Sequence, residues 1–167
     1  CLDLPEKNGR FAPNETIQKV AVIQRHDGSG RMAVGALAGF GLKRGAVATT
    51  IAHDAHNLIV AGCSDADMLC AVQELQRCQG GYTVVCEGKV LKTVTLSMAG
   101  LFTDDETLNV TKELEEIAQL CHDMGVPEGI DPFVNLSFLA LPVIPELRIT
   151  DVGIFDVMQN KFLTENG

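Results

Sequence analysis

Two histidines, an aspartate and an asparagine stand close together in the segment His53-Asp54-Ala55-His56-Asn57. Imidazole and carboxylate side chains bind first-row metal ions and transfer protons near neutral pH. These groups are costly to bury without partners, and they gather where chemistry takes place. We therefore predict catalytic roles for His53, Asp54 and His56, and a substrate contact from Asn57.

A third histidine extends this prediction to metal binding. His26 follows a predicted strand at residues 20–23, and His53 and His56 lie at the end of a predicted strand at residues 46–52. If these strands are neighbours, their ends bring the three imidazoles together, so His26, His53 and His56 are candidate metal ligands. Two alternatives are a hydrogen-bonded structural cluster and a wall of an active site whose other residues lie elsewhere.

A basic loop precedes the strand at residues 46–52. Lys43 and Arg44 lie in a segment framed by glycines, where their side chains can hold an anion or a carboxylate. We predict that both residues bind substrate. The loop lacks the Gly-x-x-x-x-Gly-Lys-Ser/Thr order of a nucleotide-binding P-loop. The alternative is a tight turn with two solvated basic side chains.

The pattern of apolar residues and chain breakers predicts an α+β fold, in which a mixed β-sheet is layered by two main helices. Residues 1–16 are expected to form an irregular N-terminal arm, and residues 17–167 a single domain. Strands are expected at residues 20–23, 31–40, 46–52, 58–61, 82–86, 89–96 and 153–163.

Two helices are expected between these strands. The first begins at Ser64 or Asp65 and ends near Arg77. The second begins at a Thr-x-x-Glu capping box at residues 103–106 and ends at Met124. The segment 132–145 is apolar but interrupted by prolines, so we expect it to cover the core rather than to pair centrally in the sheet.

The composition argues against several classes of function. The 167 residues carry a formal net charge of −9, lack tryptophan and are 5% aromatic, which argues against nucleic-acid binding. No apolar run approaches the length of a membrane-spanning helix, and no signal-peptide pattern is present, so we expect no membrane partner. The six cysteines form no Cys-x-x-Cys pair. We expect free thiols in a reducing compartment, and hence a cytoplasmic protein.

Several motifs resemble, in type and order, those of the C-terminal domain of bacterial adenine deaminase, in the amidohydrolase superfamily. The resemblance covers roughly residues 15–160 and rests on RH at 25–26, GFGLKRGA at 39–46, HDAHN at 53–57, GGY at 80–82, LSMAGL at 96–101, PF at 132–133, LSFLALPVIPEL at 136–147 and TDVG at 150–153. One departure is Ala55, where the family often carries serine.

The resemblance implies an enzyme that hydrolyses adenine to hypoxanthine and ammonia, with Mn²⁺ or Fe²⁺ held in a (β/α)8 barrel. This sequence contains no His-x-His metal motif, and a typical barrel alone needs about 250 residues. The resemblance therefore implies a C-terminal domain or fragment that packs on the barrel of the same protein and is inactive alone. Residues 53–57 would complete or cover the active site. We also expect a homo-oligomer.

Two other functions stay open. The chain can be a structural or dimerisation module, with residues 132–145 as its interface and the histidines as internal hydrogen-bonding groups. It can also be a small independent hydrolase that uses the histidine cluster or Cys1, because an N-terminal cysteine can act as a nucleophile with its own amine as base.

Overall fold

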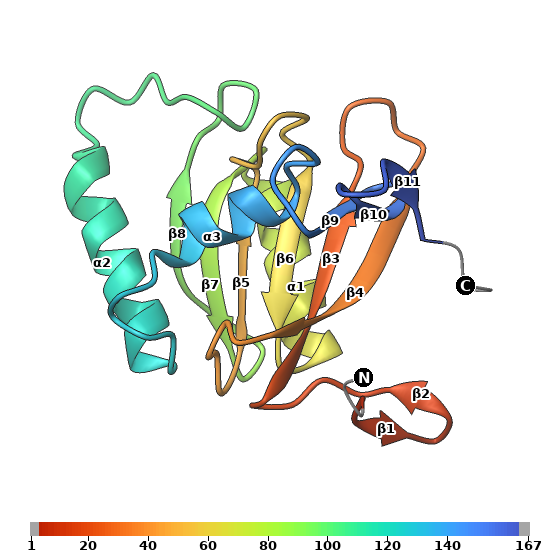
Figure 1. Cartoon of the computed structure of the whole chain (residues 1–167). Helices are drawn as coiled ribbons and strands as arrows, with labels where there is room; N and C mark the ends of the chain where they lie inside the picture. Colours follow the sequence, from red (N-terminus) through yellow and green to blue (C-terminus); the bar gives the residue numbers. More distant parts are fainter. Residues whose placement is uncertain (1–3, 164–167) are drawn as a thin grey trace.

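A computed structural model of the chain describes residues 4–163 and has a six-stranded sheet at its centre (Figure 1). The strands, in spatial order, are β4 (Met32–Ala38), β3 (Ile17–Ile23), β6 (Leu58–Gly62), β5 (Ala46–Thr49), β7 (Gly81–Cys86) and β8 (Lys89–Thr95). The pairings between these six strands are all antiparallel. The predicted α+β class is confirmed, as is the hairpin of β7 and β8.

Helices cover both faces of this sheet. Helix α1 (Asp65–Arg77) packs on one face, and α2 (Val110–Asp123) and α3 (Pro132–Leu139) pack on the other (Figure 1). Successive residues of a strand point to opposite faces. In β6, Val60 therefore joins the cluster beneath α1, whereas Ile59 joins the cluster beneath α2 and α3. The continuous apolar run at residues 58–61 is buried on both sides, as its sequence indicates.

The first helix begins as predicted, but the second does not. The Ser64 side chain caps α1 by accepting a hydrogen bond from the Asp67 amide. The predicted start of the second helix at Thr103 is wrong, because the polar residues there form local turns instead. The Thr103 hydroxyl accepts from the Asp105 amide at 3.1 Å, and the Asp105 carboxylate accepts from the Thr107 amide at 2.9 Å.

The true start of α2 lies several residues later. Asn109 is its N-cap, and its side chain accepts a hydrogen bond from the Lys112 amide at 3.2 Å. The segment 132–145 covers the core as predicted, and its first half is helix α3. Asp131 caps α3 by accepting from the amides of Phe133 and Val134. Aspartate followed by Pro132 at the first turn is a common helix start.

Two small sheets flank the central one. Within the predicted irregular arm, β1 (Glu6–Lys7) pairs with β2 (Arg10–Phe11). The strands β9 (Leu147–Thr150), β10 (Gly153–Asp156) and β11 (Lys161–Phe162) form a three-stranded sheet that packs on β3 and β4. The single strand expected at residues 153–163 is therefore two strands joined by a turn.

Two further expectations concern the cysteines and membranes. Cys63, Cys70, Cys78, Cys86 and Cys121 are free thiols, and Cys1 lies outside the described residues. Among the described helices, none combines the length and the hydrophobicity that a membrane crossing requires.

Candidate functional site

The histidine-containing segment forms the loop that joins β5 to β6, and Thr50 anchors its start. The Thr50 hydroxyl donates a hydrogen bond to the Gly100 carbonyl at 2.7 Å and accepts one from the Gly81 amide at 2.8 Å. Gly81 begins β7, and Gly100 lies in the turn that follows β8. The loop is therefore tied to two other segments at the same end of the sheet (Figure 1).

Arg25 anchors the far end of the loop. It follows β3, and its Nε donates to the His56 carbonyl at 2.7 Å. A second guanidinium nitrogen donates to the Ala99 carbonyl at 2.7 Å. One side chain thus links the histidine loop to the turn after β8, and the hydrogen bonds of a charged donor are stronger than neutral ones.

The three histidines converge at one end of the sheet, although β6 lies between β3 and β5, so the two strands that precede them are not the neighbours that we predict. The ring centres of His53 and His56 are 5.8 Å apart. Nε2 of His26 lies 2.7 Å from the Ala55 carbonyl oxygen. The side chains of His53 and Asp54 are 48% and 85% exposed, with His53 Nδ1 3.9 Å from Asp54 Oδ1. His53 and Asp54 therefore form a solvent-facing tip on a loop that is fixed at both ends.

His56 lies beneath this tip and differs from His53. Its Nδ1 is buried and has no hydrogen-bond partner among the described residues. Burial lowers the pKa of His56, and the charges of His53 and Arg25 lower it further. The neutral imidazole is thus favoured, and His56 is suited to positioning the loop.

The structure gives no support to a metal centre built from this chain alone. Within residues 4–163, no group of three or more His, Cys, Asp or Glu side chains is arranged to hold a metal ion. The Nε2 atom of His26 already faces a carbonyl oxygen rather than the other two rings. The Mn²⁺ or Fe²⁺ that the resemblance implies does not fit His26, His53 and His56 as they stand.

Asn57 is placed inside the fold rather than on the exposed tip. It is 5% exposed, and its Nδ2 donates to Asp151 Oδ1 at 3.1 Å. Asp151 also forms an ion pair with Arg31, at 2.6 Å. Asn57 therefore connects the loop to the turn between β9 and β10, and the substrate contact that we predict for it from the sequence stays a prediction.

Lys43 and Arg44 do not join the histidine loop. They precede β5, whereas the loop follows it, so the two segments lie at opposite ends of the strand (Figure 1). Both side chains are exposed, and the Lys43 amide donates to the Met124 carbonyl at 2.9 Å. Within the described residues, this geometry does not bring the predicted basic substrate contacts to the histidine site.

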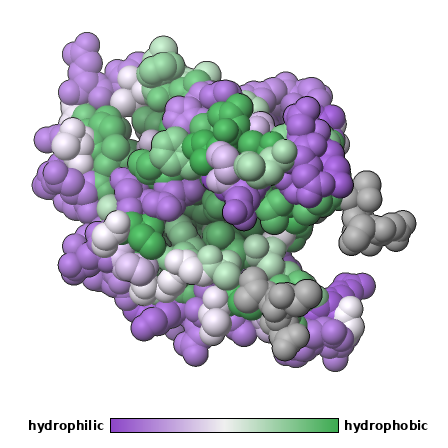
Figure 2. Space-filling model, viewed as in Figure 1, coloured by the Kyte–Doolittle hydropathy of each residue, from purple (hydrophilic) through white to green (hydrophobic). Residues whose placement is uncertain are grey.

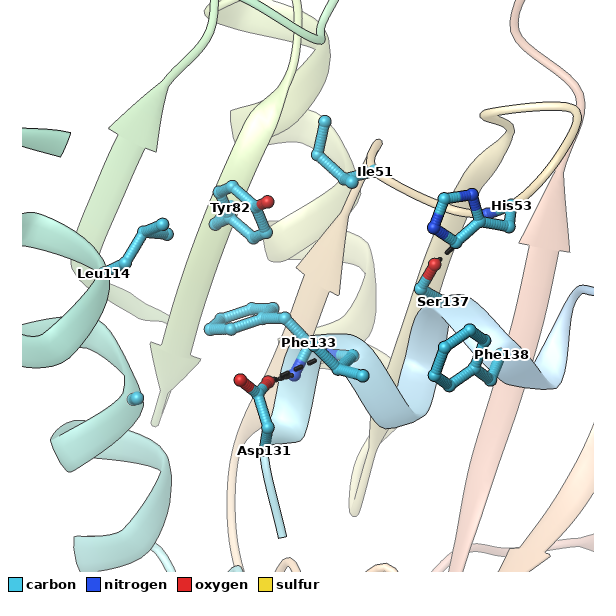
Figure 3. A pocket seen from close by; sticks show the side chains of 10 residues that line it. Ile51, His53, Tyr82, Leu114, Asp131, Phe133, Ser137 and Phe138 are labelled. Carbon is cyan, nitrogen blue, oxygen red and sulfur yellow. Dashed lines mark hydrogen bonds between the residues drawn. The ribbon is translucent and has the colours of Figure 1, made fainter. Parts of the chain in front are cut away.

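A pocket adjoins the histidine loop, between α2, α3 and the sheet (Figure 3). Its volume is about 240 Å³. His53 stands at its rim, and the His53 amide donates to the Ser137 hydroxyl of α3 at 3.1 Å. The walls also include Ile51, Tyr82, Leu114, Ala118, Asp131, Phe133, Val134 and Phe138.

Sequence reasoning missed most of these pocket residues. They come from β7, α2 and α3, and only the fold brings them beside the loop. The sparse aromatic composition gave no sign of the pocket. The chain has seven phenylalanines and one tyrosine, and three of these eight aromatic residues, Tyr82, Phe133 and Phe138, line this one pocket.

Comparison with known proteins gives the family. The family described as "Adenine deaminase C-terminal domain" matches residues 1–161. The chain is 47% identical over 160 residues to "Adenine deaminase" of Desulfitobacterium hafniense (strain Y51), covering 96% of this chain and 28% of that protein. It is 48% identical over 158 residues to "Adenine deaminase 2" of Carboxydothermus hydrogenoformans, covering 93% of this chain and 28% of that protein.

A third relative agrees with the first two. The chain is 50% identical over 151 residues to "Adenine deaminase" of Clostridium acetobutylicum, covering 90% of this chain and 26% of that protein. The chain thus spans little more than a quarter of the length of these relatives. With a family match over nearly its whole length and identities near one half, the chain belongs to the adenine deaminase C-terminal domain family.

Proposed function

We propose that this chain is the C-terminal part of an adenine deaminase, a hydrolase that converts adenine and water into hypoxanthine and ammonia. The family match supports this proposal, since the relatives bear that name. The remaining part of the protein would be an amidohydrolase barrel that holds the divalent metal, Mn²⁺ or Fe²⁺. The described residues of this chain form no metal site of their own, so we assign the metal to that other part.

The observation that carries a functional role for this domain is the exposed tip of the histidine loop. Thr50 and Arg25 hold the loop at both ends, yet the His53 ring forms no hydrogen bond within residues 4–163. A fixed loop with a free imidazole is suited to contact a surface outside the domain. We propose that His53 and Asp54 meet the catalytic domain, where they bind substrate or move a proton, and that His56 positions them.

The test is a comparison of variants in the full-length enzyme. We expect His53→Ala and Asp54→Asn to lower kcat/KM at least tenfold while the midpoint of thermal unfolding stays within a few degrees, because both side chains are exposed. Glu115→Ala, at an exposed position on α2, is the control and should change neither quantity. A lowered midpoint with unchanged kcat/KM would instead make the loop a structural cluster.

A second expectation concerns the chain by itself. The 167 residues lack the His-x-His motif of the implied catalytic barrel. We expect no release of ammonia from adenine by the purified chain at rates typical of enzymes, about 1–10³ s⁻¹. Turnover that a chelator abolishes would contradict this expectation and favour an independent hydrolase.

We further propose that the protein is cytoplasmic and forms a homo-oligomer. The five free cysteines of the described residues support a reducing compartment. The edge strand β4 supports self-association, because it pairs only with β3 among the described strands and contains no charged residue or proline. The proposed interface at β4 is not the one at residues 132–145 that the sequence analysis leaves open. The first half of that segment is helix α3, which packs on the core.

A further inference from the structure

The pocket beside the histidine loop has aromatic walls from three separate elements. Tyr82 comes from β7, and Phe133 and Phe138 come from α3. The rings of Tyr82 and Phe133 meet edge to face, with centres 4.9 Å apart. Phe138 lies nearly parallel to the His53 ring, at 6.0 Å and 21°. Flat aromatic ligands stack on such surfaces, and each base stacked on an aromatic ring gains about 1–3 kcal/mol.

Polar groups with unused hydrogen-bonding capacity stand at the edge of the same pocket. The Tyr82 hydroxyl has no partner within residues 4–163, and burial raises its pKa, so it remains a donor at neutral pH. The Asp131 carboxylate uses Oδ1 to cap α3, which leaves Oδ2 as an acceptor. The His53 imidazole supplies a third polar group (Figure 3).

The size of the pocket restricts the ligand. Its volume of about 240 Å³ is below the about 300–1,000 Å³ of pockets that hold drug-sized molecules. One or two fused rings therefore suit it better than a nucleotide. The absence of lysine and arginine from its walls also disfavours a phosphate group.

We propose that this pocket binds a free purine base, with its faces against the aromatic side chains and its edge on Tyr82, Asp131 and His53. A purine base presents ring nitrogens that accept hydrogen bonds from Tyr82 and N–H groups that donate to Asp131. The choice of purine among flat bases rests on the proposed deaminase function, whereas the pocket itself stands on its geometry. The site would hold substrate or product beside the loop that we assign to the active site.

The exposed surface around the pocket is consistent with ligand entry from the face that carries α3. Val134 and Phe138 are 46% and 42% exposed, and Figure 2 shows hydrophobic side chains gathered over α3 with hydrophilic surface around them. The part of the protein beyond this chain can also cover this surface. A base bound in the pocket would then lie between the two parts, where ligand sites often occur.

The chain offers a single reporter for this site. Tyr82 is its only tyrosine, so incorporation of 3-fluorotyrosine gives one ¹⁹F resonance, located in the pocket wall. We expect adenine and hypoxanthine to shift this resonance in a saturable way. Phe138→Ala should weaken binding about tenfold, as loss of one stacking ring predicts. Tyr82→Phe, measured by calorimetry, should weaken it about fivefold through loss of one hydrogen bond.

The matched control is Phe102→Ala, which removes an aromatic ring of 65% exposure outside the pocket and should leave binding unchanged. Cooperative thermal unfolding establishes that each variant is folded. A folded chain whose ¹⁹F resonance does not respond to either base overturns the proposal, as does equal weakening by Phe138→Ala and Phe102→Ala. If the chain does not unfold cooperatively alone, equilibrium dialysis of hypoxanthine with full-length protein should show a site whose dissociation constant rises about tenfold in Phe138→Ala, and an unchanged binding isotherm overturns the proposal.

These outcomes are separate from the test of the deaminase function. Loss of kcat/KM in the full-length His53→Ala enzyme, together with no base binding to the folded domain, would refute the purine pocket and leave the proposed function standing. Base binding to the folded domain, together with unchanged turnover in the full-length His53→Ala enzyme, would support the purine pocket and refute the proposed role of the histidine loop.

Discussion

His56 adopts a backbone conformation that most residues avoid, with φ at +49°. Its amide donates to the Ala52 carbonyl at 2.7 Å, and its carbonyl accepts from Arg25. The residue therefore closes a tight turn that lifts His53 and Asp54 to the surface. Its imidazole faces the charges of His53, Arg25, Asp54 and His26, and burial holds its pKa below the ordinary 6.5.

This lowered pKa predicts how stability changes with pH. Because the unfolded chain binds the His56 proton more tightly than the folded chain, the contribution of neutral His56 is fully present above about pH 6.5. It is lost as the pH falls from there toward the folded pKa. The free energy of unfolding, measured in urea between about pH 8 and pH 5, should therefore fall more in the wild type than in His56→Asn.

Asparagine is the suitable replacement because it tolerates a positive φ better than most residues. An equal pH dependence of the free energy of unfolding in the two proteins would contradict the prediction. It would show that another group causes the loss of stability at low pH. An Asn variant that is less stable by the same amount at every pH would point to lost packing alone.

At the scale of elements, the start of a helix or the position of a hairpin turn is predictable where a single sequence signal marks it. The Ser64 cap and the Glu87-Gly88 hairpin are as expected. The start of α2 was misplaced because Thr103, Asp105 and Asn109 all offer capping side chains. Thr103 and Asp105 accept hydrogen bonds from amides two residues later and so form turns, and only Asn109 caps the helix.

The candidate site shows a second limit. The convergence of His26, His53 and His56 was predictable because each follows a strand of one sheet. The pocket could not be predicted, because Tyr82 and Phe133 are 51 residues apart in the sequence and meet only when α3 packs across the sheet. No local pattern marks Asp131 as both a helix cap and a pocket wall.

Two glycines of the β7–β8 hairpin test how the elements hold the loop. Gly81 has φ at +128°, and a Cβ there would overlap the Val94 carbonyl oxygen. Gly88 has φ at +71°, with nothing within 4 Å of such a Cβ. We expect Gly88→Ala to cost about 1–2 kcal/mol of unfolding free energy, from backbone strain alone. Gly81→Ala should cost at least about 3 kcal/mol, since overpacking adds to strain.

The Gly81 amide also donates to Thr50, so its displacement should disturb the histidine loop. Denaturant unfolding of both variants measures the two costs, and kcat/KM of the full-length Gly81→Ala enzyme measures the effect on the loop. Equal costs for the two glycines would show that the hairpin relaxes around the added methyl group.

At the scale of the whole molecule, the two edges of the central sheet differ. The β8 edge carries Lys89 and Lys92, and Lys92 joins the sheet to α2 through ion pairs with Glu113 at 2.7 Å and Glu116 at 2.5 Å. The β4 edge has no such protection. Met32 and Val34 on its outer face are 61% and 46% exposed. An uncharged, apolar edge strand is a template for pairing with a second chain.

We predict that a single charge on this edge prevents self-association. Val34→Lys should convert an oligomer of the full-length protein into a smaller species, because a charge on an edge strand opposes pairing and the lysines of two paired β4 strands would repel each other. Val90→Lys, at a 40% exposed position on β8, is the matched control and should keep the wild-type mass. Both variants add one positive charge and so make the formal net charge of −9 less negative by the same amount. General repulsion between copies therefore weakens equally in each. Light scattering after gel filtration gives the masses. An unchanged mass in Val34→Lys would place the interface elsewhere and leave β4 as a surface covered by the rest of the protein.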